Sequence, residues 1–108
     1  MEITEAQQIF KDIEQLPNKE LISQFVIKAS SYAKTRIDWY VAELENKQDI
    51  DSMRTRSHNV FIDYCNILSR EMQKQGLDNT WRKQLGNDRK RIGDFACYVV
   101  AIVGVRAR

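Results

Sequence analysis

The chain of 108 residues has little of what bends or cross-links a backbone: one proline, four glycines and two cysteines. A single proline leaves room for long helices, because proline removes a backbone donor and breaks helices from within. Two cysteines are too few for the disulfide framework of a small secreted domain. A chain of this length, 43% hydrophobic, is expected to fold as one domain over residues 1–108 around a single core.

Long hydrophobic runs are also missing. The longest, Phe95–Val105, has eleven residues, whereas a membrane helix needs about 20. The first ten residues, MEITEAQQIF, carry acids where a secretory signal has a basic start and an apolar centre. We therefore expect a cytoplasmic protein with reduced thiols and no membrane contact.

Residues for catalysis and cofactor binding are scarce. His58 is the only histidine, and no Cys-x-x-Cys or paired Glu-x-x-His motif accompanies it, so no metal site is predicted. The four glycines match neither a P-loop nor a dinucleotide fingerprint, so no cofactor is expected. With no catalytic residues to assign, the sequence favours a binding protein over an enzyme.

Apolar residues recur every three or four positions along most of the chain, which is the spacing of amphipathic helices. We expect helices near 4–15, 18–46, 51–75, 80–85 and 87–106. Four substantial helices joined by short turns predict an all-α fold, an antiparallel four-helix bundle with a short extra helical segment. The expected N-caps are Thr4, Asn18, Asp51 or Ser52, Asp78 or Asn79, and Asn87 or Asp88. Gly76 with Leu77 is expected to end the third helix in a Schellman turn.

The last expected helix is highly apolar. Its segment Tyr98–Val105 is rich in valine and isoleucine, which also favours a strand. We favour a helix, because a lone strand in a helical chain would have to pair across a dimer. An apolar surface all round this helix indicates a central element or a subunit contact, and we expect a homo-oligomer.

The net charge of +2 hides an uneven distribution. Residues 1–51 carry 6 basic and 10 acidic side chains, a net charge of −4, whereas residues 52–108 carry 11 and 5, a net charge of +6. This polarity indicates either a basic binding face or two halves that pack against each other or against a second copy. We favour packing, because +6 is modest for a nucleic-acid binder.

The third expected helix holds a polar strip at spacings of four, three and four residues, made of Asn59, Asp63, Asn66 and Arg70. It is either the solvated edge of an otherwise apolar helix or a recognition cleft of amides, a carboxylate and a guanidinium. We favour the solvated edge.

A basic cluster follows, made of Trp81, Arg82, Lys83, Arg89, Lys90 and Arg91. Cations beside an exposed aromatic ring can bind phosphates and stack a base. The simpler interpretation is a solvated turn in which Trp81 closes the end of the core, and no helix-turn-helix or zinc-finger signature accompanies the cluster. Nucleic acid is therefore the alternative partner, behind another protein or a second copy.

Two charges, Arg36 and Asp94, fall at or beside apolar faces of their helices, and His58 lies at the rim of a third such face. An unpaired buried charge costs about 3–5 kcal/mol. We therefore expect Asp94 to meet Arg36 or His58 across the bundle.

Two segments resemble a small bacterial family of uncharacterised helical proteins: HNVFIDYCNILSR (58–70) and WRKQLGNDRKRIGDFACYVVAIVG (81–104). The resemblance covers the C-terminal half and implies a bacterial, cytoplasmic setting without a particular chemistry. Arg54 and His58 also resemble the Arg-x(4–6)-His motif of HEPN ribonucleases, all-α dimers that cleave RNA. Only three residues separate them here, which departs from that motif. We expect a self-associating interaction module, with nucleic-acid binding as the alternative and ribonuclease activity as the lesser one.

Overall fold

The computed structural model describes all 108 residues and contains helices but no strands. A 3-10 turn, η1 (Leu44–Asn46), separates the second and third of five helices: α1 (Ile3–Ile13), α2 (Lys19–Val41), α3 (Lys47–Lys74), α4 (Thr80–Leu85) and α5 (Arg89–Arg106). The predicted all-α fold is confirmed, and residues 98–105 are helical. No helix in the chain combines the length and the apolar character needed to cross a membrane.

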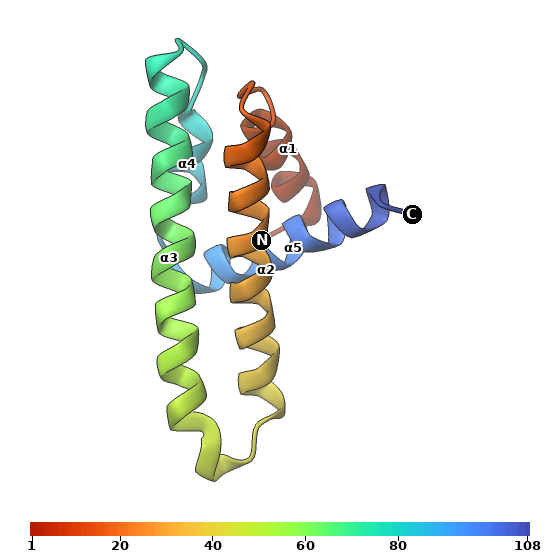
Figure 1. Ribbon diagram of the computed structural model, residues 1–108, viewed down its shortest axis with the longest axis vertical. Coiled ribbons are helices and arrows are strands. Elements are labelled where there is room, and N and C mark those ends of the chain that lie inside the picture. The colour runs from red at the N-terminus through yellow and green to blue at the C-terminus, as the bar shows by residue number, and fades with distance from the viewer.

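The arrangement of the helices differs from the expected four-helix bundle. Helices α2 and α3 form a long antiparallel hairpin, and the remaining helices pack against one side of it (Figure 1). Helix α5 crosses the hairpin instead of running alongside it, and its C-terminal half projects beyond it. The buried residues of α5 all lie between Ile92 and Val99, and beyond them Val100, Ile102 and Val103 are only partly buried against the core. Val105 near its end is 67% exposed.

The core lies where α5 crosses the hairpin. The ring centroids of Phe25 and Phe61 lie 5.2 Å apart, and each lies 6.3 Å from that of Phe95. This aromatic cluster joins α2, α3 and α5, and a single group of 18 buried residues extends from it into α1 and α4. The lower part of the hairpin continues beyond the crossing without cover from other helices (Figure 1).

Two of the expected N-caps are confirmed. The Asn18 side chain accepts a hydrogen bond from the Leu21 amide at 3.0 Å, and Asp88 caps α5 in the same way. The prediction for Thr4 is wrong, because α1 already begins at Ile3, and the residue before it makes no side-chain cap. The prediction of Asp51 or Ser52 is also wrong, because both lie inside α3, and Asn79 precedes α4 without a side-chain cap. An N-cap side chain accepts a hydrogen bond from a backbone amide only three residues further along the chain. Such a cap can therefore be recognised in the sequence.

The Schellman turn after α3 is also confirmed. The Leu77 amide donates to the Met72 carbonyl at 2.9 Å, and the Gly76 amide donates to the Gln73 carbonyl at 3.1 Å. Gly76 has φ +72°, a left-handed conformation that glycine adopts without a steric penalty.

The turn between α2 and α3 lies elsewhere than expected. Helix α2 ends at Val41 instead of near residue 46, and α3 begins at Lys47 instead of residue 51 or 52. Lys47 explains the early start, because its Nζ donates to the Trp39 carbonyl at 2.7 Å and lies 4.1 Å from the Trp39 ring centre. It thereby satisfies a carbonyl that the end of α2 leaves free.

Candidate interaction surface

The structure brings together two of the three residues expected to form a charge pair. Arg36 Nη1 donates to Asp94 Oδ1 at 3.1 Å, and the amine of Met1 donates to Oδ2 at 3.2 Å. Burial by itself would raise the pKa of Asp94, but these two hydrogen bonds outweigh it and hold that pKa below its usual value. The contact joins α2 to the first half of α5 and stabilises their crossing.

His58 lies apart from this pair. Its ring meets that of Tyr32 edge-on, with centroids 5.3 Å apart, and its Nδ1 lies 3.3 Å from Asn59 Oδ1. Its Nε2 is buried without a hydrogen-bond partner. His58 therefore packs at the α2–α3 contact and does not reach Asp94.

Arg54 lies one turn before His58 on the same face of α3, but it is engaged with other partners. Its guanidinium lies 4.3 Å from the Trp39 ring centre and donates to Asp51 at 2.7 Å. A cation held over a ring and bound to a carboxylate is already neutralised. Arg54 and His58 therefore have separate packing partners in place of a shared open cleft.

The aromatic member of the basic cluster is not available for base stacking. Trp81 is 1% exposed, and its Nε1 donates to Met72 Sδ at 3.2 Å. Arg82 beside it uses its guanidinium on Asn66 Oδ1 at 2.7 Å and on the Gly86 carbonyl at 2.8 Å. These two residues hold α4 against α3.

The other arginines of the cluster also have partners within the chain. Arg91 forms an ion pair with Glu5 of α1, and Arg89 donates to a threonine hydroxyl of α3 at 3.0 Å. Lys83 and Lys90 are the two members that are exposed and make no hydrogen bond or ion pair. The tryptophan and the arginines of the cluster therefore make contacts within the chain, and only the two lysines remain without partners.

The polar strip lies along α3 and is mostly solvated. Asn59, Asp63 and Arg70 are exposed, whereas Asn66 is half-buried under Arg82. No hydrogen bond joins any two of the four side chains. The strip does not form a cleft of its own, but it borders a surface that sequence reasoning missed.

That surface is an apolar stripe on α3, formed by Met53, Val60 and Ile67. The three side chains are seven residues apart and are 49%, 39% and 36% exposed. Seven residues are close to two helical turns, so the three lie almost in line along the helix. A shallow groove beside the stripe separates it from α2 and contains the small side chains of Ser31 and Ser57. The spacing of seven is the signal that could have revealed the stripe in the sequence.

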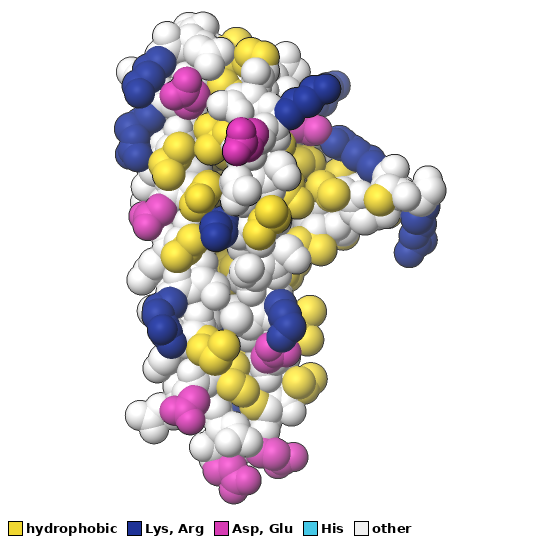
Figure 2. Space-filling view, in the orientation of Figure 1, with side chains coloured by type: hydrophobic (Ala, Val, Ile, Leu, Met, Phe, Trp, Pro, Cys, Tyr) yellow, Lys and Arg dark blue, Asp and Glu magenta, His cyan; other side chains and the backbone are white.

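A charged row flanks the apolar stripe, and its members are also seven residues apart: Asp49, Arg56, Asp63 and Arg70. All four are exposed, and none forms an ion pair or hydrogen bond within the chain. Figure 2 shows basic and acidic side chains alternating along the α3 edge, with hydrophobic side chains between α2 and α3. We call the stripe, the groove and the charged row together the open face of the hairpin.

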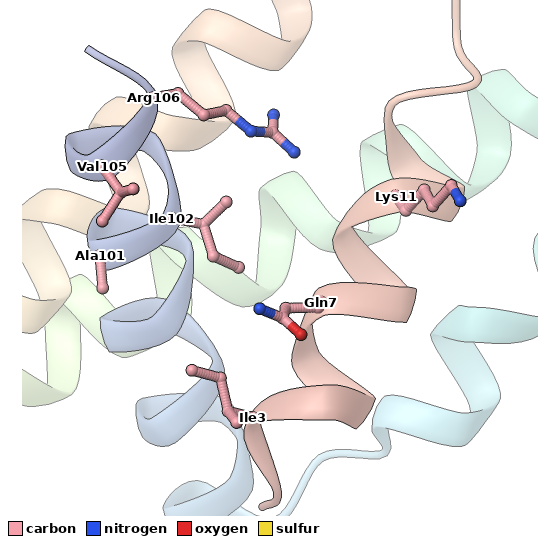
Figure 3. A pocket seen from close by; sticks show the side chains of 7 residues that line it. All are labelled: Ile3, Gln7, Lys11, Ala101, Ile102, Val105 and Arg106. Carbon is pink, nitrogen blue, oxygen red and sulfur yellow. The ribbon is translucent and has the colours of Figure 1, made fainter. Parts of the chain in front are cut away.

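Two further apolar surfaces are exposed. Side chains of α1 and of the projecting half of α5 face each other across a groove (Figure 3), lined by Ile3, Gln7, Lys11, Ala101, Ile102, Val105 and Arg106. Its arginine is already paired with Glu14 at 2.7 Å. The free end of the hairpin exposes between 59% and 85% of four side chains: Ile37, Tyr40, Val41 and Leu44. Neither surface has a row of unpaired charges like that of the open face.

The chain matches no protein-family model, no curated protein and no solved structure.

Proposed function

We propose that this protein is a small helical interaction module that binds another protein chain through the open face of the α2–α3 hairpin. The observation that carries the proposal is the apolar stripe of Met53, Val60 and Ile67, which stays exposed along the middle of the longest helix. Exposed apolar patches with polar borders mark protein interaction sites. A spacing of seven residues is the one that packs one helix against another.

The composition of the open face favours protein over nucleic acid as the partner. Its charged row carries two acids and two bases, so it does not attract a polyanion as a basic surface does. The basic cluster supports the nucleic-acid alternative weakly, because Trp81 is buried and Arg82 and Arg91 are engaged. The ribonuclease alternative has less support still, since Arg54 is held by Asp51 and Trp39. A cytoplasmic setting with reduced cysteines fits such a module.

A photocrosslinking residue at position 60 tests this function. Val60 is replaced by benzoylphenylalanine, and the protein is irradiated in the cells that produce it. We expect covalent products with protein, either a second copy or another chain. The matched control places the same residue at Lys83, which is exposed on α4 outside the open face. Crosslinks to nucleic acid, or protein crosslinks no stronger than those from position 83, would contradict the proposal.

A further inference from the structure

We infer that the open face binds a second copy of this chain, with the two α3 helices packed antiparallel about a two-fold axis near Val60. This inference rests on the proposed function, because it names the partner of the same face. It follows from three independent properties of α3: the position of the apolar stripe, the order of the charged row, and the absence of ion pairs for that row within one chain.

The apolar stripe is centred on α3. Thirteen residues of the helix precede Val60 and fourteen follow it, so an antiparallel pair with its axis at Val60 overlaps over the full helix length of about 42 Å. Val60 then faces its own copy, and Met53 faces Ile67 of the second copy. Every residue of the stripe meets an apolar residue, and the stripe forms the continuous apolar centre that stable interfaces have.

The charged row is complementary to a second copy of itself that runs in the opposite direction. A two-fold axis perpendicular to α3 places the same flank of both helices side by side, with the residue order inverted. Asp49 then faces Arg70 of the second copy, and Arg56 faces Asp63. The alternating order of acid and base therefore yields only opposite charges in contact. In a parallel pair the row would lie against the other flank of α3, which carries Ile50, Ser57, Tyr64 and Glu71. Only Arg70 would then meet an oppositely charged residue of the second α3, whereas the antiparallel pair brings all four charges against opposite ones.

Self-complementarity of this kind points to a second copy and not to an unrelated protein. An interface with two-fold symmetry uses one surface twice, so that surface has to be its own complement. A surface for an unrelated partner is under no such constraint. Two open faces in contact also place four long helices side by side, so that the four-helix arrangement expected within one chain would form between two chains.

The inference is tested by reversing the charges at the centre of the row. The dimerisation of each full-length variant is then measured by sedimentation equilibrium. Arg56 and Asp63 are seven residues apart on one helix, about 10.5 Å along its axis, so they do not pair within a chain. We expect Arg56→Asp and Asp63→Arg each to weaken dimerisation about tenfold, because each reversal turns both symmetric contacts from attraction to repulsion. The chain that carries both reversals is expected to dimerise like the unmodified protein.

Lys90→Glu, an exposed reversal outside the open face, is the matched control and should leave dimerisation unchanged. Helical circular dichroism confirms that each variant is folded. A chain that stays monomeric at every concentration overturns the inference. Dimerisation that is unchanged by the single reversals, or that the double reversal does not restore, also overturns it. The proposed function survives these results if position 60 crosslinks to a different protein. It falls with the inference if position 60 crosslinks to none.

Discussion

The guanidinium of Arg36 lies against the backbone of Gly93, where a Cβ atom would be only 2.8 Å from Nη1. The same Nη1 donates to Asp94 Oδ1 at 3.1 Å. Two consecutive residues of α5 therefore act on one side chain of α2, because Gly93 leaves space for it and Asp94 binds it. This contact helps to fix where α5 crosses the hairpin, and with it which side of the hairpin stays open.

Replacing Gly93 by alanine is expected to displace the Arg36 guanidinium and to destabilise the fold by up to about 1 kcal/mol. Alanine is the better helix former by about 1 kcal/mol, but its Cβ would push Arg36 away from Asp94. Thermal unfolding followed by circular dichroism measures the change. In an Arg36→Ala background the same Gly93→Ala substitution should be neutral or stabilising. Stabilisation by Gly93→Ala with Arg36 in place would show that the contact does not constrain the crossing.

Removal of the Asp94 carboxylate is expected to cost about 1–3 kcal/mol. Asp94→Ala leaves the partly buried Arg36 and the Met1 amine without their acceptor. Asp38→Ala is the matched control, because Asp38 pairs with Lys34 on the exposed surface of one helix and should cost no more than about 0.5 kcal/mol. Equal melting temperatures for Asp94→Ala and the unmodified protein would rule out a stabilising role for this carboxylate.

The stabilisation by Asp94 should depend on pH in a defined direction. Its pKa is lower in the folded chain than in the unfolded one, so its contribution is complete above the unfolded value of about 3.9. The contribution is lost as the pH falls through the folded pKa. Denaturant titrations should therefore show a difference between the unmodified chain and Asp94→Ala at neutral pH that shrinks at acid pH. A difference that persists undiminished in acid would assign the cost to packing instead of charge.

Features set by neighbouring residues could be predicted from the sequence. Asn18, Asp88 and Gly76 act on backbone groups within a few positions, and the structure confirms each of them. The sequence does not predict the end of α2 at Val41, because no proline or glycine marks it. Lys47, at the start of α3, bonds to the Trp39 carbonyl near that end, a contact that is not visible in a pattern of hydrophobic residues.

Features that depend on distant contacts could not be predicted. The crossing of α5 depends on the approach of Arg36 to Gly93, which lies more than fifty positions along the chain. The exposure of Met53 and Val60 depends in turn on the side of the hairpin to which α5 docks. The same holds for the basic cluster, because the sequence shows the charge of Arg82 but not the carbonyl and amide oxygens that bind it.

Polynucleotides are expected to bind negligibly at physiological salt. Only Lys83 and Lys90 of the basic cluster are free to contact phosphates, and two contacts supply little of the counterion release that drives such binding. Titration with labelled single-stranded RNA and duplex DNA at low and physiological salt measures this. Submicromolar binding at low salt that is lost when Arg89, Lys90 and Arg91 are reversed to Glu would instead make the basic cluster a functional site.

Disulfide trapping between two singly substituted chains tests the antiparallel pairing of α3 most directly. Met53→Cys and Ile67→Cys chains are prepared separately, mixed and oxidised, with Cys65 and Cys97 replaced by serine or alanine in both. The antiparallel pairing predicts that the mixture forms the mixed disulfide, and that neither chain forms a dimer with itself. A Met53→Cys chain that cross-links efficiently to its own copy, or a mixture that forms no disulfide at all, would contradict the pairing of open faces.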